Sequence, residues 1–145
     1  MELLPALAIS ASGLTAERLR LDIIANNLAN INTTRTPQGG PYRREVPVFA
    51  ERLQEAMGQL PGRPSSRAPG AGVEVAAIVE DNSPPRLVYD PSHPDADANG
   101  YVHLPNINIV NEMVDMITAS RAYEANVTVL NAAKAMTLKA LEIGR

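Results

Sequence analysis

The 145-residue sequence contains no cysteine and no tryptophan, and aromatic residues make up only 3% of it. Without cysteine the chain has no disulfide bond, no thiolate zinc site and no cysteine nucleophile. The scarcity of aromatic residues argues against a surface that recognises ligands by stacking. Only two histidines are present, which leaves little material for nucleophilic or acid–base catalysis. We therefore expect a protein that is not an enzyme and that needs no cofactor.

Clustered positive charge and long apolar runs are also absent. The formal net charge is −3, and both signs are scattered along the chain. Nucleic-acid-binding domains usually carry a basic stripe, so we expect no nucleic-acid partner. No apolar run approaches the roughly 18 residues that suggest a membrane-spanning helix. The chain starts with Met1 and Glu2, an acidic start where a secretory signal is basic. We expect either a cytoplasmic protein or one exported by a route that cleaves no signal.

Proline is missing from residues 106–145, and the only glycine there is Gly144. Apolar or small residues recur at alternating steps of three and four, with Lys134 in the one gap, as in a coiled-coil seam. A helix over about 107–143 would be roughly 55 Å long, whereas a compact globule of this size is about 40 Å across. Another long helix, or other copies of the chain, must therefore bury it. The predicted seam is Ile109, Met113, Met116, Ser120, Tyr123, Val127, Leu130, Thr137 and Leu141.

The N-terminal residues supply a second helix with the same spacing. We predict it from about Pro5 to about Asn30, because proline suits a first helical turn, with Gly13 as a possible bend. The two terminal helices would pair as an elongated, coiled-coil-like core. The apolar members of the N-terminal series are Leu4, Leu7, Ala11, Leu14, Leu21, Ala25 and Leu28.

Four asparagines crowd the end of this helix, and two interpretations of them stay open. They are Asn26, Asn27, Asn30 and Asn32. Asparagine is a mediocre helix former but a good cap, because its side chain replaces backbone partners. On that basis the cluster marks a frayed helix end. Alternatively, the amides hydrogen-bond to a neighbouring helix or subunit and fix its register.

Residues 33–105 differ in character, because eleven of the twelve prolines lie there and exclude long helices. Short β-rich runs and turns fill the segment, and Pro47 places its own run at a sheet edge. The predicted elements are an extended segment over Tyr42–Phe49, a short helix over 50–57, a loop over 60–72, strands over Val73–Val79 and Arg86–Tyr89, and a polar loop over 90–105.

The predicted fold class is therefore α+β, mainly α. Residues 1–32 and 106–145 would form a terminal-helix core domain, and residues 33–105 an extended linker with a small proline-rich β-module. Pro105 stops the C-terminal helix from extending backward, and Asn106 or Asn108 is placed to cap its start.

One stretch has the composition of a metal loop. Asp95, Asp97, Asn99 and Gly100 match the first half of a calcium-binding loop. The twelfth position of that pattern should be glutamate, but it is Asn106, and prolines replace the entering helix. The two histidines, His93 and His103, have no recognised zinc-ligand spacing. We therefore favour a turn over a calcium or zinc site and expect no metal.

Longer motifs carry a resemblance to a known family. The segment ANNLANINT at 25–33 resembles the N-terminal signature of the axial proteins of the bacterial flagellum, which include rod, hook and hook-associated proteins. Residues 54–72 show no such motif. Similarity to the proximal rod in particular extends over TRT at 34–36, GGPYRR at 39–44, YDPSHPDAD at 89–97, GYV at 100–102, PN at 105–106, NEMVDMI at 111–117, SRAYEAN at 120–126 and ALEIGR at 140–145.

The resemblance implies a structural subunit of the basal-body rod, in which terminal helices pack into the tubular core of a drive shaft that transmits torque from the motor to the hook. It implies export through the flagellar type III apparatus without a cleaved signal, and assembly in the periplasm. The implied partners are other rod proteins, copies of the chain itself, the rod-base adapter protein and the membrane-anchored ring protein. The alternative is another self-assembling axial or adhesin-like coiled-coil protein, which would not need the rod partners.

The two seams and the asparagine cluster define the residues expected to pack between subunits. Each buried leucine or methionine would contribute about 1.5–3 kcal/mol. Small residues widen the apolar face of the C-terminal helix beyond what one partner covers, and an open head-to-tail contact of such faces generates a helical tube. The expected subunit-packing residues are Leu7, Leu14, Leu21, Asn26, Asn27, Leu28, Asn30, Met113, Met116, Tyr123, Val127, Leu130 and Leu141.

Overall fold

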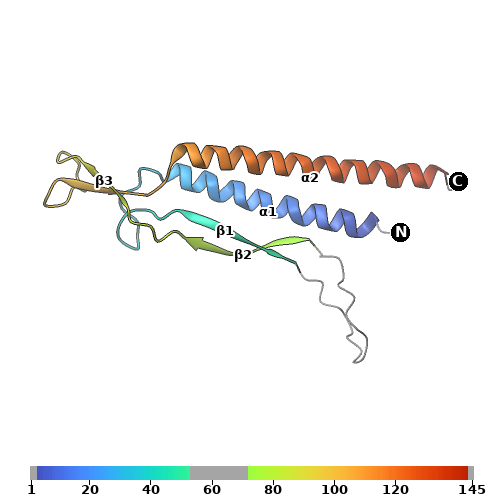
Figure 1. The fold of residues 1–145 in the computed structure, drawn as a ribbon, viewed down its shortest axis with the longest axis horizontal. Helices are drawn as coiled ribbons and strands as arrows, with labels where there is room; N and C mark the ends of the chain where they lie inside the picture. The colour runs from blue at the N-terminus through green and yellow to red at the C-terminus, as the bar shows by residue number, and fades with distance from the viewer. Residues whose placement is uncertain (1–2, 53–71, 144–145) are drawn as a thin grey trace, which may run out of the picture.

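The structure is a computed structural model that describes residues 3–52 and 72–143. Two long helices lie side by side and antiparallel, and a two-stranded ribbon follows the other side of the first helix (Figure 1). This arrangement confirms the predicted α+β class. The elements in order are α1 (Leu3–Ala29), β1 (Glu45–Glu51), β2 (Val73–Glu80), β3 (Arg86–Tyr89), β4 (Tyr101–Leu104) and α2 (Ile109–Ile143).

Helix α1 lies close to its predicted bounds. It begins at Leu3 and ends at Ala29, one residue before the predicted end. It is continuous through Gly13, so this glycine does not interrupt the helix. The glycine instead allows close packing, because a Cβ at Gly13 would lie 3.1 Å from the side-chain nitrogen of Asn126 on α2.

Helix α2 begins where a cap is available. The Asn108 Oδ1 accepts the backbone N–H of Val110 at 2.9 Å and that of Asn111 at 3.4 Å, which satisfies two donors that a helix start leaves free. Of the two predicted caps, Asn108 is thus confirmed. With 35 residues against 27 for α1, α2 extends beyond the N-terminal end of α1 (Figure 1).

The helices meet along a seam that is rotated from the predicted one. The buried positions on α2 are Glu112, Ala119 and Ala133, and two of these are alanines, which let the helix backbones approach closely. The predicted Met113 and Leu141 lie beside this row and are 51% and 66% exposed. Steps of three and four connect the buried residues through the half-buried Met116, Tyr123, Asn126, Leu130 and Thr137.

The middle of the chain forms two separate two-stranded antiparallel sheets, β1 with β2 and β3 with β4. The predicted helix over 50–57 is wrong at Ala50 and Glu51, which continue β1. It is also wrong at Arg52, which is in no helix. Residues 53–57 of that prediction, like most of the predicted 60–72 loop, lie outside the described residues. Pro47 is at a sheet edge as predicted, since among the described residues β1 pairs only with β2.

The predicted polar loop over 90–105 is wrong at its end. Residues Tyr101–Leu104 form β4 and pair with β3 in a hairpin, from Arg86 opposite Leu104 to Tyr89 opposite Tyr101. The strand is too short to show a pattern of its own, and its pairing partner lies more than ten residues earlier. Val102 in β4 and Ile107 just after it are buried, so the end of the predicted loop also contributes to the core.

Candidate functional site: the helix junction and the outer face of helix α2

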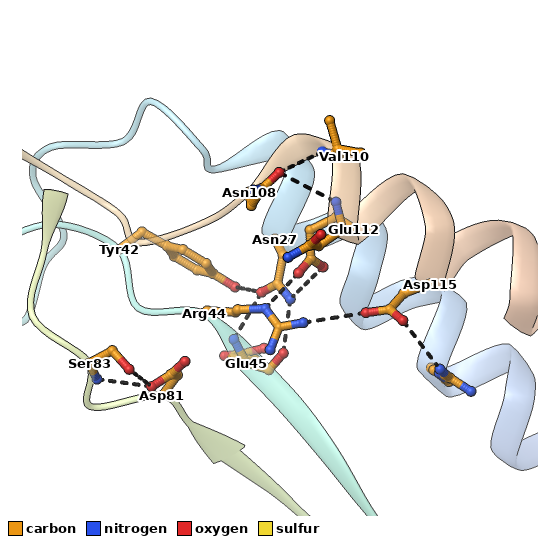
Figure 2. Close-up of polar contacts among 12 residues, drawn as sticks. Asn27, Tyr42, Arg44, Glu45, Asp81, Ser83, Asn108, Val110, Glu112 and Asp115 are labelled. Carbon is orange, nitrogen blue, oxygen red and sulfur yellow. Dashed lines mark hydrogen bonds and ion pairs between the residues drawn. The ribbon is translucent and has the colours of Figure 1, made fainter.

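Asn27 occupies a polar junction where α1 ends and where β1 and α2 begin (Figure 2). Only 1% of this residue is exposed. Its Nδ2 donates to the Glu45 carbonyl at 2.9 Å and to Glu112 Oε2 at 3.3 Å. Its Oδ1 accepts the Glu45 backbone N–H at 2.9 Å and the Tyr42 hydroxyl at 3.1 Å. Both donors and both acceptor positions of the amide are used, so one side chain ties together three segments of the fold.

Glu112 is the charged partner in this junction. It lies in the first turn of α2, where a negative charge is favourable to the helix dipole, and it is 1% exposed. Arg44 Nε donates to Glu112 Oε1 at 2.6 Å, a charge-assisted hydrogen bond. Ion pairs of 3.6 Å from Arg44 to Asp115 and of 3.8 Å from Arg20 to Asp115 continue the network onto α1. A buried carboxylate is tolerated here because it is both paired and hydrogen-bonded.

Tyr42 closes the junction on the side of the loop before β1. Burial, together with the carboxylates of Glu45, Glu112 and Glu80, raises the pKa of the Tyr42 phenol from 10.0 to about 12. The hydroxyl therefore keeps its proton and donates it to Asn27. It also accepts the Asn26 side-chain N–H at 3.2 Å.

Each of the two interpretations of the asparagine cluster, a bond to a neighbouring helix and a local helix end, applies to a different asparagine. Asn27 bonds to the neighbouring helix, through Glu112. Asn30 closes the helix end, because its Nδ2 donates to the Asn26 carbonyl at 3.0 Å and to Asn26 Oδ1 at 3.1 Å. Thr33 extends this local network by donating to Asn30 Oδ1 at 3.1 Å.

The aspartate-rich loop before β4 is a turn, as predicted. Asp97 Oδ1 accepts the backbone N–H groups of Asn99 and Tyr101 at 2.8 and 2.9 Å. Asp95 accepts the Thr34 hydroxyl at 2.7 Å and pairs with Arg35 at 2.8 Å. These hydrogen bonds lower the pKa values of both aspartates. Within residues 3–52 and 72–143, no three side chains are grouped to hold a metal ion.

A second contact that joins α1 to the ribbon involves Ser12 and Gly72. The Ser12 hydroxyl donates to the Ile9 carbonyl at 2.6 Å and accepts the Val73 backbone N–H at 3.1 Å. Gly72 has a φ of +112°, and a Cβ there would overlap the Ser12 hydroxyl oxygen. Glycine is therefore required at this position, both for its backbone angle and for space.

The expected subunit-packing residues fall into three groups. Asn27 is buried in the junction, whereas Asn26, Met113 and Leu141 are exposed. The half-buried remainder lies along the two helices. It comprises Leu7, Leu14, Leu21, Leu28, Asn30, Met116, Tyr123, Val127 and Leu130.

Sequence reasoning missed the charged members of the junction, Arg44 and Glu112. A charged residue near a helix start normally reads as exposed, and Arg43-Arg44 is followed at once by Glu45. The one available signal was Glu112 inside a helix otherwise rich in apolar residues. That signal does not identify the residue that pairs with Glu112, because Arg44 lies 68 positions earlier in the sequence.

The start of α2 presents an apolar surface to solvent, which we call the α2 patch. Within the described part of the chain no helix is long and apolar enough to cross a membrane. Val110 is its most exposed member, at 67%. The patch comprises Ile109, Val110, Met113, Val114 and Ile117.

Both ends of the chain match family models. Residues 7–35 match the flagella basal body rod protein model, and residues 98–143 match the model of the C-terminal region of the flagellar basal body rod FlgEFG proteins. The matched residues contain most of α1 and all of α2. The fold and these matches define an axial rod protein of the flagellar basal body, built on paired terminal helices.

Comparison with curated proteins narrows the class. The chain is 52% identical to the flagellar basal-body rod protein FlgC of Borreliella burgdorferi, over 99% of this chain and 98% of the relative. It is 47% identical to FlgC of Bacillus subtilis, over 97% of each chain, and 44% identical to FlgC of Salmonella typhimurium, over 100% of each. The chain belongs to the FlgC family of flagellar basal-body rod proteins. It is a structural subunit of the rod, which decides against the adhesin-like alternative.

Proposed function

We propose that this chain builds the rod by pairing α1 with α2 internally and presenting the outer face of α2 to neighbouring axial subunits. The observation that carries the proposal is the α2 patch, whose five members are each about half exposed or more. Contiguous apolar surface of this kind marks an interaction site on a soluble protein.

The small core of the chain supports the same proposal. Apart from Pro105, seven apolar side chains are buried among the described residues, and three of them are the alanines Ala16, Ala119 and Ala133. Alanine contributes little apolar area, so burial within one chain uses little of the hydrophobic surface that the helices carry. Neighbours that cover α2 supply the missing burial. The expected packing residues on both helices are part of that contact, with Asn27 acting indirectly by holding the helix pair in register.

The proposed mechanical role follows from this arrangement. Residues 1–32 and 106–145 form the packed core of the shaft, and residues 33–105 lie outside it. Torque passes through many packed side chains, with no turnover and no catalytic step. The partners are other rod proteins and copies of the chain, and in finer detail the rod-base adapter protein and the membrane-anchored ring protein. The chain works in the periplasmic rod after export without a cleaved signal.

A charge placed in the α2 patch tests the proposal. Ile117→Asp changes an exposed side chain, so the free energy of unfolding should change by less than about 1 kcal/mol. The same variant should be absent from isolated basal bodies, and a strain that carries it should not swim, because an unpaired charge cannot be buried between subunits. Ala98→Asp adds the same charge to an exposed loop and serves as the matched control. Normal incorporation of Ile117→Asp into rods would overturn the proposal.

A further inference from the structure

A surface groove of about 470 Å³ lies where α1, α2 and the β1–β2 ribbon meet. Its apolar walls are Ile9, Phe49 and Val73, one from each of α1, β1 and β2. Glu17 and Asn126 add polar groups to the lining. Apolar walls that lead to a carboxylate match the shape and chemistry of a lysine side chain, whose aliphatic stem packs on apolar surface and whose ammonium group requires an acceptor.

Glu17 is under-satisfied within its own chain. Its Oε2 is buried and, among the described residues, has no hydrogen-bond donor. The nearest cation is Arg20, whose Nη1 lies 3.7 Å away. Arg20 is also shared with Asp115, at 3.8 Å. A buried carboxylate oxygen without a donor is costly. The Glu17 side chain as a whole keeps 19% of its surface exposed and lines the groove, so a donor from outside the chain can approach its carboxylate.

The charge balance of the ion-pair network that ends at Glu17 points to a cation. Ion pairs join Glu17 to Arg20, Arg20 to Asp115, Asp115 to Arg44 and Arg44 to Glu112. This connected network holds three carboxylates and two guanidinium groups, which leaves an excess of one negative charge. One further cation at Glu17 would neutralise it.

The same chain carries a cation suited to this place. On a helix, ion pairs form between residues three or four apart. Arg18 has Asp22 within that reach, Arg121 has Glu124, and Lys139 pairs with Glu142 at 2.8 Å.

Lys134 is the remaining helix lysine, and it has no acidic residue three or four positions away. It is exposed on α2, in the row that leads from Leu130 to the exposed Leu138 and Leu141. Its ammonium group is thus available to a neighbour and is flanked by apolar side chains.

We propose that Lys134 of a second copy of this chain docks in the groove and pairs with Glu17, while Leu138 of that copy packs on Ile9 and Phe49. The proposal rests on the proposed function, because it names one partner and one contact of the assembling subunit. The charge match is the reason for choosing a second copy as the occupant. Since the groove and Lys134 are different surfaces, the contact is heterologous and leaves a free groove and a free lysine at the ends of a row of copies, as a helical assembly requires.

Disulfide cross-linking in rods isolated from cells tests the contact, because the chain has no cysteine of its own. Two chains are co-expressed, one with Ile9→Cys and the other with Leu138→Cys, so that only different copies can be linked. We expect a cross-linked dimer that mass spectrometry identifies by both cysteine peptides. Lys134→Glu in the Leu138→Cys chain should lower the dimer yield about tenfold. Adding Glu17→Lys to the Ile9→Cys chain should then restore it.

Asp22→Lys, an exposed charge reversal on the same helix as Glu17, is the matched control and should leave the dimer yield unchanged. The proposal is overturned by absence of the dimer, by a dimer yield that does not change when the charge of Lys134 is reversed, or by linkage of Ile9→Cys to a different rod protein. Each of these results is read in rods that contain the chain, so the proposed function would stand. Absence of the unsubstituted chain from isolated rods would instead contradict the proposed function itself.

Discussion

The side-chain amide of Asn27 donates to the carboxylate of Glu112 at 3.3 Å across 85 positions of sequence. Each residue is 1% exposed, and each belongs to a different terminal helix. The bond therefore sets the register of α1 against α2 at the end where the chain enters and leaves the middle segment. A pair of long helices with small seam residues can slide, whereas a buried polar pair is satisfied in one register only.

Replacing Asn27 should destabilise the chain far more than replacing its neighbour. Asn27→Ala removes the acceptor of the Glu45 N–H and of the Tyr42 hydroxyl. We expect a loss of about 2–4 kcal/mol, because buried polar groups left without partners cost about 1–3 kcal/mol each. Asn26→Ala, at an exposed position, should cost about 0.5 kcal/mol. Urea unfolding of the purified variants measures both, and equal losses would contradict the assigned role.

The Arg44–Glu112 pair should show strong coupling. Arg44→Met leaves the buried Glu112 carboxylate without its cation, and we expect a loss of about 3 kcal/mol. Glu112→Gln keeps the shape and removes the charge, so the double variant should be more stable than Arg44→Met alone. A double-mutant cycle by urea unfolding measures this coupling. Simple additivity of the two single losses would show that the charges do not interact.

Two glycines with positive φ allow the cost of backbone strain to be measured separately from the cost of steric crowding. Gly39 has a φ of +88° and open space around it, whereas a Cβ at Gly72 would overlap the Ser12 hydroxyl oxygen. Gly39→Ala should therefore cost about 1 kcal/mol. Gly72→Ala should cost at least twice as much, because it also displaces the bond from Val73 to Ser12. Thermal unfolding compares them, and indistinguishable midpoints would rule out the close contact between α1 and β2.

Tyr42 should make stability fall at alkaline pH. Its folded pKa of about 12 lies above the ordinary value of 10.0, so the folded state holds a proton that the unfolded state releases. The stabilisation is complete below pH 10 and is lost as the pH rises from 10 towards 12. The urea midpoint of the chain should fall over that range, and the midpoint of Tyr42→Phe should fall less. Parallel curves for the two proteins would refute this assignment.

Local patterns in the sequence were sufficient for the helices. Spacing at three and four residues, a proline in the first turn and an asparagine before Ile109 predicted both helices to within a few residues of their ends, because these signals act between residues less than one or two turns apart. The strands β2 and β3 were also predicted from local signals, namely short β-rich runs bounded by turn residues. The strand β4 was missed, since its four residues form a strand only when paired with β3.

By itself, then, the sequence determined that the chain has two long terminal helices, a proline-rich middle and the motifs of a flagellar axial protein. The tertiary structure alone decided which face of α2 is buried. The observed seam is rotated from the predicted one, so that Met113 is exposed and Glu112 is buried. The physical reason is that burying a carboxylate depends on a cation and an amide from distant segments, Arg44 and Asn27. No pattern within α2 contains that information. The same long-range pairing leaves the α2 patch uncovered, and this is the surface that we propose for the neighbouring subunits.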